Sequence, residues 1–309
     1  MTLRQLESFL AVLELRSFRR AAERIGLSQP ALSHQVRDLE QELGSPVFER
    51  LGRTIAVTEA GWVLEPYARR MFAALQGAHE AVGELRGLRR GAVLLGASST
   101  PGIYLLPRVL GRFKAQYPGI ELALRIGNTR EIEERVRASE VDLGIVGGHL
   151  ADAKETCVEA SLPDRLVLIV GPRHRWARRA AVSPDHLAEE CLLVRENGSA
   201  TRRLTERSLD QLGVSARARL ELGHTEAIKE GVRAGLGVAF LSEYAVQSEV
   251  AAGQLRVVRV KGLTIQRHFH VIRHEARELS PGSRAFLECL HAARIRGTTT
   301  AAGPRSGRR

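Results

Sequence analysis

The chain is poor in aromatic side chains and in cysteine. Phe, Trp and Tyr make up 5% of its 309 residues, which excludes a nucleic-acid interface built mainly on aromatic stacking platforms. Its three cysteines are Cys157, Cys191 and Cys289. An odd, scattered set does not suit a disulfide framework, so we expect inert thiols in a reducing compartment. A redox-sensing pair is the less favoured alternative.

Long apolar runs are also missing. No run approaches the ~18 residues that a membrane span needs, and the N-terminus lacks the basic-then-apolar pattern of a secretory signal. We therefore expect a cytoplasmic protein with no membrane partner. Hydrophobic residues still make up 44% of the chain, which is enough for globular cores, and the length favours about two domains.

Acidic residues are outnumbered by basic ones, and the formal net charge is +11. This excess suggests a polyanionic partner. It supports nucleic acid only weakly, because residues 1–58 are nearly neutral and the segment 296–309 carries four arginines and no acid. That segment is low in apolar residues, so we expect a disordered basic tail.

The stretch FRRAAERIGLSQPALSHQVRDLE, residues 18–40, holds two apolar patterns of helical spacing broken by a glycine. Gly26 permits the left-handed conformation that ends a helix. Ser17 and Ser28 are candidate N-caps for the two helices, and Pro30 suits the first turn of the second. Because a further apolar helix precedes this pair, residues 1–58 are expected to form a helix-turn-helix domain.

The second helix of the pair leaves polar side chains on its outer, N-terminal face, where they suit base edges and phosphates in a major groove. They are Ser28, Gln29, Pro30, Ser33, His34 and Arg37. Strand-like residues on both sides of Leu51-Gly52-Arg53 predict a two-stranded wing, with Arg50 and Arg53 at its tip for phosphate contacts. The alternative is an ordinary helical hairpin with a solvated polar face.

The run AAERIGLSQPALSHQVRDLEQELGSPVFERLGRTIAVTEAG resembles the DNA-binding domain of LysR-type transcriptional regulators. The core Ser-Gln-Pro-Ala-Leu-Ser and the segments Phe48-Glu49-Arg50 and Thr58-Glu59-Ala60-Gly61 all fall in register. The resemblance implies sequence-specific binding to double-stranded promoter DNA, modulation by a small effector, and no cofactor.

A long helix is expected to begin after Thr58 and to occupy most of a linker over residues 59–90. Its apolar residues recur at steps of four and three, which is a heptad seam typical of a dimerising helix. The seam is Leu64, Ala68, Met71, Leu75, Ala78, Val82 and Leu85. The alternative is a single surface helix that packs one face on its own domain.

Strand and helix patterns alternate from residue 91 to about residue 295, which predicts α/β units. The pattern divides into lobe 1, residues 91–162 and 267–295, and lobe 2, residues 163–266, joined by two crossovers. The expected fold class is therefore mixed: an N-terminal α-helical winged helix-turn-helix, a long linker helix, and a two-lobed α/β domain. By family likeness the two-lobed part is of the periplasmic-binding-protein type II.

Three hydroxyl-rich loops are expected where helices begin, and helix N-termini attract anions. Together with neighbouring residues these loops form the predicted effector site. Arg195 or Arg202 could add a positive charge to it. The site residues are Ser98, Ser99, Thr100, Asn128, Thr129, Gly147, Ser199 and Thr201, and the resemblance to LysR-type regulators adds Thr225 at the lobe junction. The expected ligand is an oxyanion or a carboxylate. The alternative is that each hydroxyl only caps its own helix.

The runs GASSTPGIYLLP, RIGNT and RENGSATR are similar to a subgroup of LysR-type regulators that controls sulfur metabolism, anion responses and carbon-dioxide fixation. Pro101 departs from that subgroup and could alter its loop. The resemblance further implies a homodimer, a homotetramer by family likeness alone, and RNA polymerase as a partner.

Two other classes of function were weighed. The two lobes would suit a solute-binding protein, but a 90-residue N-terminal segment does not. Enzyme candidates are His149 with Asp142, Cys191 with His186, and the histidines 268, 270 and 274. None has the spacing of a known nucleophile or metal site, so we expect neither catalysis nor a bound metal.

Overall fold

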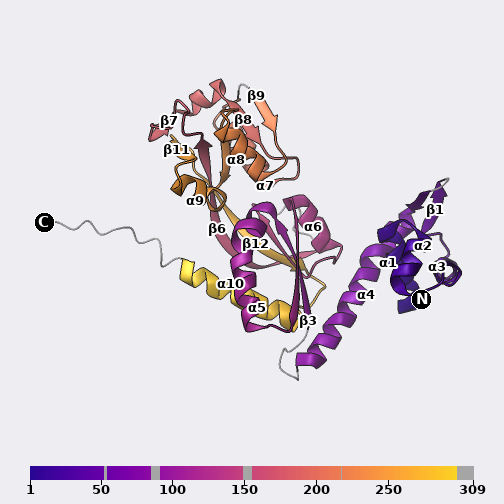
Figure 1. Cartoon of the computed structure of the whole chain (residues 1–309). Helices are drawn as coiled ribbons and strands as arrows, with labels where there is room; N and C mark the ends of the chain where they lie inside the picture. Colours follow the sequence, from indigo (N-terminus) through magenta and orange to yellow (C-terminus); the bar gives the residue numbers. More distant parts are fainter. Residues whose placement is uncertain (52–53, 85–90, 149–154, 217, 298–309) are drawn as a thin grey trace.

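The structure is a computed structural model that describes residues 1–51, 54–84, 91–148, 155–216 and 218–297. The N-terminal head holds three helices and a two-stranded hairpin, and one long helix leads from it to the two-lobed part (Figure 1). The head consists of α1 (Leu3–Leu15), α2 (Phe18–Ile25), α3 (Gln29–Leu43), β1 (Phe48–Leu51) and β2 (Thr54–Val57).

Local signals define the helix-turn-helix. The hydroxyl of Ser17 accepts from the Arg20 N–H at the start of α2, and that of Ser28 accepts from the Ala31 N–H at the start of α3. Gly26 ends α2 with a φ of 69°, a conformation that favours glycine. These predictions are confirmed, and β1 pairs antiparallel with β2 as the predicted wing.

The linker helix α4 spans Glu59–Glu84 and begins at Thr58, whose hydroxyl accepts from the Gly61 N–H at 3.2 Å. The predicted seam is wrong in its first two members. Leu64 is 9% exposed and Ala68 is fully buried, because both belong to the hydrophobic core of the head. The first turns of α4 thus pack on the chain's own domain.

An apolar stripe nevertheless runs along the outside of α4. It is formed by Val63, Tyr67, Met71, Leu75, Ala78 and Val82. Val63 is 61% exposed and Val82 is 66% exposed, and a contiguous exposed apolar surface of this kind often marks a protein–protein contact. Leu85, the last seam position, lies outside the described residues.

Lobe 1 is built on parallel strands, and β3 pairs with both β4 and β5. The strands are β3 (Gly91–Ser98), β4 (Ile120–Gly127) and β5 (Leu143–Gly147), and the helices are η1 (Pro101–Leu105), α5 (Leu106–Gln116), α6 (Thr129–Arg137) and α10 (Pro281–Gly297). Phe113 of α5 packs edge-on against Phe286 of α10 in the core. Helix α10 extends to Gly297, slightly into the expected tail, and residues 298–309 lie outside the described part.

Lobe 2 has its own core around the buried Trp176. Its strands are β7 (Ala181–Val182), β8 (Cys191–Val194), β9 (Ala218–Glu221), β10 (Ala239–Ser242) and β11 (Arg256–Val260). Its helices are η2 (Pro184–Glu189), α7 (Ala200–Gln211), α8 (Thr225–Arg233) and α9 (Glu243–Ala251). Strand β10 pairs with β6, and Val238, directly before β10, forms an isolated bridge to Leu192 of β8.

Two long strands connect the lobes. Strand β12 (Ile265–His274) pairs antiparallel, along its whole length, with strand β6 (Thr156–Val170). One end of this ladder lies beside β5 in lobe 1, and β6 continues at its other end beside β10 and β11 in lobe 2. Both crossovers therefore lie side by side, near Pro163–Asp164 and Arg267–His268 (Figure 1).

Among the described residues, no helix is both long enough and apolar enough to span a membrane.

Candidate functional site

The polar face of α3 is accessible. Gln29, His34 and Arg37 are exposed, and Ser33 is partly so. Gln29, Ser33 and Arg37 follow each other at four-residue steps, so they lie on one side of the helix. The Arg37 Nε–H donates to the Ser33 carbonyl at 3.3 Å, which leaves the two terminal nitrogens of the guanidinium for another partner.

Other predicted DNA-binding residues have different surroundings. The His34 ring lies 2.9 Å from a carboxylate oxygen of Asp38, one turn along α3. Ser28 caps α3, and Pro30 stands in its first turn. Arg50 occupies β1 opposite Ile55, whereas Arg53 at the wing tip lies outside the described residues.

The predicted effector loops meet around Arg195, a buried residue that follows β8 in lobe 2. Its Nη1 donates to the Thr225 hydroxyl at 2.9 Å, and its Nη2 donates to the Ser99 hydroxyl of lobe 1 at 3.1 Å. Ser99 in turn donates to the carbonyl of Gly127, at the start of the second loop. One guanidinium therefore joins two of the expected loops to a third element.

Two further contacts close the lobes on each other. The Arg130 backbone N–H of lobe 1 donates to the Gly198 carbonyl of lobe 2 at 3.3 Å. The Tyr104 hydroxyl, on η1, donates to Glu226 at the start of α8. Burial and the neighbouring carboxylate of Glu226 raise the pKa of Tyr104 well above its ordinary value, so the phenol stays protonated as the donor.

Arg267 is a buried member of this site that the sequence analysis did not identify. It lies on β12 between the lobes, and its Nε donates to Asp164 of β6 at 2.6 Å. Its Nη1 donates to the Thr201 hydroxyl at 2.9 Å. The second oxygen of Asp164 accepts from the Ser242 hydroxyl at 2.7 Å.

Helix N-termini at the lobe junction differ in how they are capped. Asn128 accepts from the Glu131 N–H at 3.0 Å in a reciprocal capping box. The observed contacts of Asn128 are therefore those of a helix cap, as in the alternative interpretation of this loop. The N-termini of α7, after Ser199, and of α8, after His224, have no side-chain cap bond. Their first N–H groups are thus the better anion donors.

The remaining predicted residues lie in the same region. Ser98, Thr100 and Thr129 are buried in lobe 1, and Thr100 precedes the π-helical turn η1. Gly147 lies against Arg267: a Cβ at this position would stand 3.2 Å from the Nη1 atom. Arg202, weighed as an alternative cation, is paired with Glu206 and Glu221, and Arg195 is itself paired with the adjacent Glu196.

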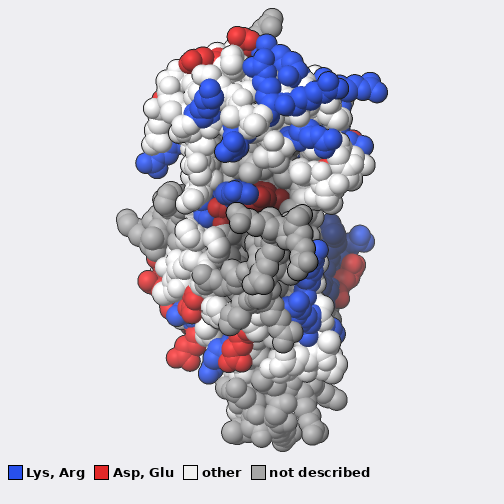
Figure 2. Space-filling view, turned by 90° about the vertical axis from the view of Figure 1, so that its left-hand side faces the viewer, with Lys and Arg blue, Asp and Glu red and all other residues white. Residues whose placement is uncertain are grey.

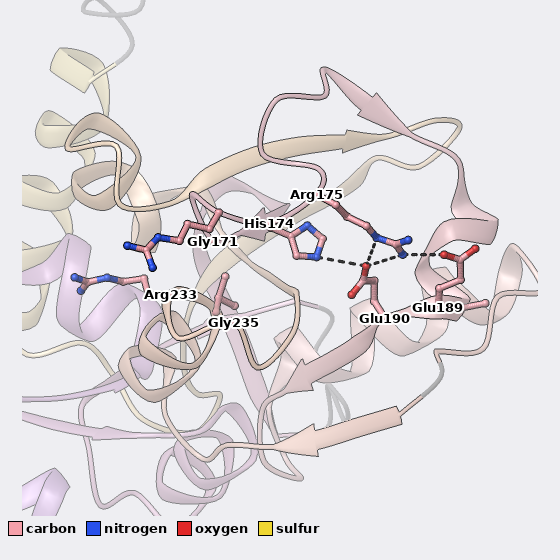
Figure 3. Close-up of a pocket in the computed structure, with 10 residues that line it drawn as sticks. Gly171, His174, Arg175, Glu189, Glu190, Arg233 and Gly235 are labelled. Atoms are coloured by element: carbon pink, nitrogen blue, oxygen red, sulfur yellow. Dashed lines mark hydrogen bonds and ion pairs between the residues drawn. The ribbon is translucent and has the colours of Figure 1, made fainter.

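A separate cavity of about 870 Å³ opens on lobe 2 (Figure 3). One wall carries Arg175, whose guanidinium binds Glu189 and Glu190, and His174 lies 3.4 Å from Glu190. Arg233 and Gly235 belong to its opposite side. None of the predicted effector residues lines this cavity.

Basic side chains gather on the outer surface of lobe 2 (Figure 2), whereas the visible part of lobe 1 mixes both signs. Exposed cations on the segment before β7, on β11 and directly after β11 include Arg173, Arg178, Arg179, Arg259 and Lys261. The positive excess of the chain is therefore not confined to the C-terminal segment.

The enzyme candidates do not assemble into a reactive group within the described part of the chain. Asp142 accepts from the Leu94 N–H and pairs with Arg277, and His149 lies outside the described residues. His270 contacts the Ser161 hydroxyl at 2.9 Å, and His274 contacts Arg70 at 3.3 Å. The described residues hold no cluster of three or more His, Cys, Asp or Glu that could bind a metal.

Two family models match nearly the whole chain. Residues 3–62 match the bacterial regulatory helix-turn-helix protein of the lysR family, and residues 86–294 match the LysR substrate binding domain. The chain belongs to the LysR family. As a LysR regulator it combines a DNA-binding head with an effector-binding domain, and members of the family are transcriptional regulators that bind promoter DNA.

Curated relatives of this LysR regulator are similar over almost their full length. The transcriptional activator CmpR of Synechocystis is 35% identical, over 94% of this chain and 95% of CmpR. A RuBisCO operon transcriptional regulator of Acidithiobacillus ferrooxidans is 34% identical, over 96% of this chain and 95% of the relative. The name of the second relative agrees with the carbon-dioxide-fixation part of the expected subgroup.

Solved structures show the same architecture. A full-length OxyR variant of Pseudomonas aeruginosa is 26% identical and superposes with a TM-score of 0.76, covering 96% of this chain and 95% of OxyR. The regulatory domain of Synechocystis CcmR, solved in complex with 2-PG, is 32% identical with a TM-score of 0.63. It covers 66% of this LysR regulator and 98% of the CcmR domain.

Proposed function

We propose that α3 reads promoter DNA through Gln29, Ser33 and Arg37, with Ser28, Pro30 and His34 beside them and Arg50 and Arg53 on phosphates. The accessible polar row of α3 is the observation that carries this part. Its position after a glycine-ended α2 matches a recognition helix that enters the major groove.

The effector is a small anion held between the lobes. Arg195 supports this most directly, because it is buried and joins hydroxyls of both lobes. The uncapped N-termini of α7 and α8 supply further donors for an anion. The complex of the related CcmR domain with 2-PG points to the same kind of ligand.

A homodimer forms through the apolar stripe on α4, which gives each assembly two heads for two half-sites. Val63 and Tyr67 replace Leu64 and Ala68 in this proposal, because the latter two are buried in the head. We also propose a homotetramer and a contact with RNA polymerase, and both rest on the family resemblance alone.

Fluorescence anisotropy with labelled DNA from upstream of its own gene tests the function. The full chain should bind this DNA more tightly than a shuffled duplex, and alanine at Gln29, Ser33 and Arg37 should remove the difference. Addition of 2-PG should change the affinity. A triple variant that keeps the wild-type preference and strength for the upstream DNA would contradict the assignment of α3.

A further inference from the structure

Arg267 has a buried donor that no described residue accepts. Its Nε and Nη1 atoms are bound by Asp164 and Thr201, but Nη2 has neither a hydrogen-bond acceptor in the described part of the chain nor contact with solvent. The residue as a whole is 6% exposed. Burying an N–H of a charged group without an acceptor is costly, so such groups are rare in proteins.

The orientation of this guanidinium is fixed by its surroundings. Asp164 is itself held by Ser242, and the Phe269 ring lies beneath Arg267 with its centroid 5.1 Å from Cζ. Gly147 packs closely on the guanidinium, because a Cβ there would stand 3.2 Å from Nη1. The unfilled donor is thus presented in one direction rather than left free to rotate.

A second buried cation, Arg195, acts electrostatically on Arg267. Burial lowers the pKa of Arg267, the neighbouring Asp164 opposes that change, and repulsion from Arg195 lowers the pKa further. Arg195 lies on the same side of the lobe junction and contacts Ser99 and Thr225. Arg195 is paired with Glu196 and Arg267 with Asp164; an anion near both guanidinium groups would offset their remaining repulsion, whereas a neutral ligand would not.

The guanidinium of Arg267 also lies near a helix N-terminus. Thr201, which accepts from Nη1, lies in the first turn of α7, where no side chain caps the backbone N–H groups. The twelve-residue helix α7 adds a partial positive charge at this end. Two independent features, a buried unfilled donor and an uncapped helix, therefore favour a negatively charged oxygen at one place.

We propose that Arg267 binds the effector directly, its Nη2 donating to a carboxylate or phosphoryl oxygen, and so selects anionic over neutral ligands. This inference rests on the proposed function that a small molecule binds between the lobes. It adds a binding residue from β12 to the loops of the two lobes. Asp164 and Thr201 act as positioning residues, because they hold Arg267 and leave one donor for the ligand.

The test is calorimetric titration of the full chain and of Arg267→Lys. Lysine keeps the charge and can pair with Asp164, but it lacks the planar fork that serves three acceptors. Arg267→Lys should bind 2-PG at least tenfold more weakly than the wild type. Arg165→Lys is the matched control: it lies next to Asp164 on the same strand and pairs with Glu243 at the surface, so its affinity should stay at the wild-type value.

Titrations with inorganic phosphate, acetate and glycerol separate the possible ligand groups. Loss of phosphate binding alone in Arg267→Lys assigns Nη2 to a phosphoryl oxygen, and loss of acetate binding alone assigns it to a carboxylate. Stronger binding of glycerol than of either anion to the wild type would overturn the proposal.

Two results distinguish failure of this inference from failure of the proposed function. A wild-type chain that binds none of the anions contradicts the anionic effector itself. If the wild type binds 2-PG and Arg267→Lys binds it with equal affinity, only the role of Arg267 is overturned.

If Arg267→Lys does not fold, the double variant Asp164→Asn/Arg267→Gln removes both buried charges together, which proteins tolerate better. It should fold and lose 2-PG binding, and wild-type affinity would overturn the inference.

Discussion

The guanidinium of Arg69 on the linker helix lies 3.9 Å from the carboxylate of Glu140 in lobe 1. The same guanidinium binds Glu14 of α1 at 3.2 Å and Glu65 of α4 at 2.9 Å. Glu140 is also close to Arg135, near the end of α6. Helix α6 begins at the lobe junction, so a chain of contacts leads from the effector loops to the DNA-binding head.

Removing the carboxylate of Glu140 should uncouple effector from DNA. Glu140→Gln should retain 2-PG binding and DNA binding separately but reduce the effect of 2-PG on DNA affinity at least threefold. Because the ion pair is only partly buried, the cost in stability should be about 1 kcal/mol or less. Anisotropy with and without 2-PG measures the coupling.

Glu189→Gln is the control, because it disturbs only a surface pair with Arg175 in lobe 2, and it should behave as the wild type. If 2-PG changes the DNA affinity of Glu140→Gln as much as that of the wild type, this path is refuted.

Charge on the apolar stripe of α4 should separate the protomers. Met71→Glu combined with Leu75→Glu places two carboxylates on exposed apolar positions, where like charges from a partner would meet in a dimer. Light scattering after size-exclusion chromatography should show a shift toward monomer. Gln76→Glu adds charge on the same helix outside the stripe and should leave the mass unchanged. A double variant with the wild-type mass would exclude the stripe as the interface.

Gly237 should not tolerate a side chain. A Cβ at this position would lie 2.1 Å from the Cys191 carbonyl oxygen, and the neighbouring Val238 N–H donates to that same oxygen at 2.9 Å. Gly237→Ala should therefore cost about 3 kcal/mol or more, at the upper end for overpacked sites, and lower the Tm measured by calorimetry. Gly111→Ala, in α5 with open space around it, should instead stabilise by about 0.5–1 kcal/mol. Equal Tm values for the two variants would contradict this packing.

Protonation of His274 should destabilise the chain at low pH. Burial lowers the pKa of His274 and repulsion from Arg70 lowers it further, with Arg277 acting in the same direction and Glu155 and Glu275 opposing. The folded state therefore binds the proton less readily than the unfolded state, whose pKa is near 6.5. The free energy of unfolding should fall as the pH drops below 6.5 and stay constant above it as far as this group is concerned.

Urea unfolding at pH 7.5 and pH 5.5 measures the effect of His274. His274→Asn, which cannot gain the charge, should lose less stability between the two pH values than the wild type. An identical loss in both proteins would show that other groups carry the pH dependence.

The head could be predicted almost completely because its signals are local. Ser17, Gly26 and Ser28 each act within a few residues, and the structure places them as caps and turn. Leu64 and Ala68 were misplaced because a heptad pattern does not tell which partner covers it; burial in the head depends on tertiary packing.

The lobe junction was predicted in part. Hydroxyl-rich loops at helix starts were recognised, and Arg195 links two of them. Arg267 was missed because its partner Asp164 is 103 residues away in sequence, and an arginine in a strand usually faces solvent. The first half of β6 was missed as well, because its polar residues and Pro163 hide the strand that continues into Leu166–Val170.

The adjacent course of β6 and β12 restricts how the lobes can move. The two paired strands resist stretching and shear, but both can flex where they pass from one lobe to the other. We therefore expect the lobes to move relative to each other mainly by rotation about an axis near these two crossovers. Any effector that binds between the lobes would therefore act on the rest of the protein in the same way, by setting how far the two lobes close on each other.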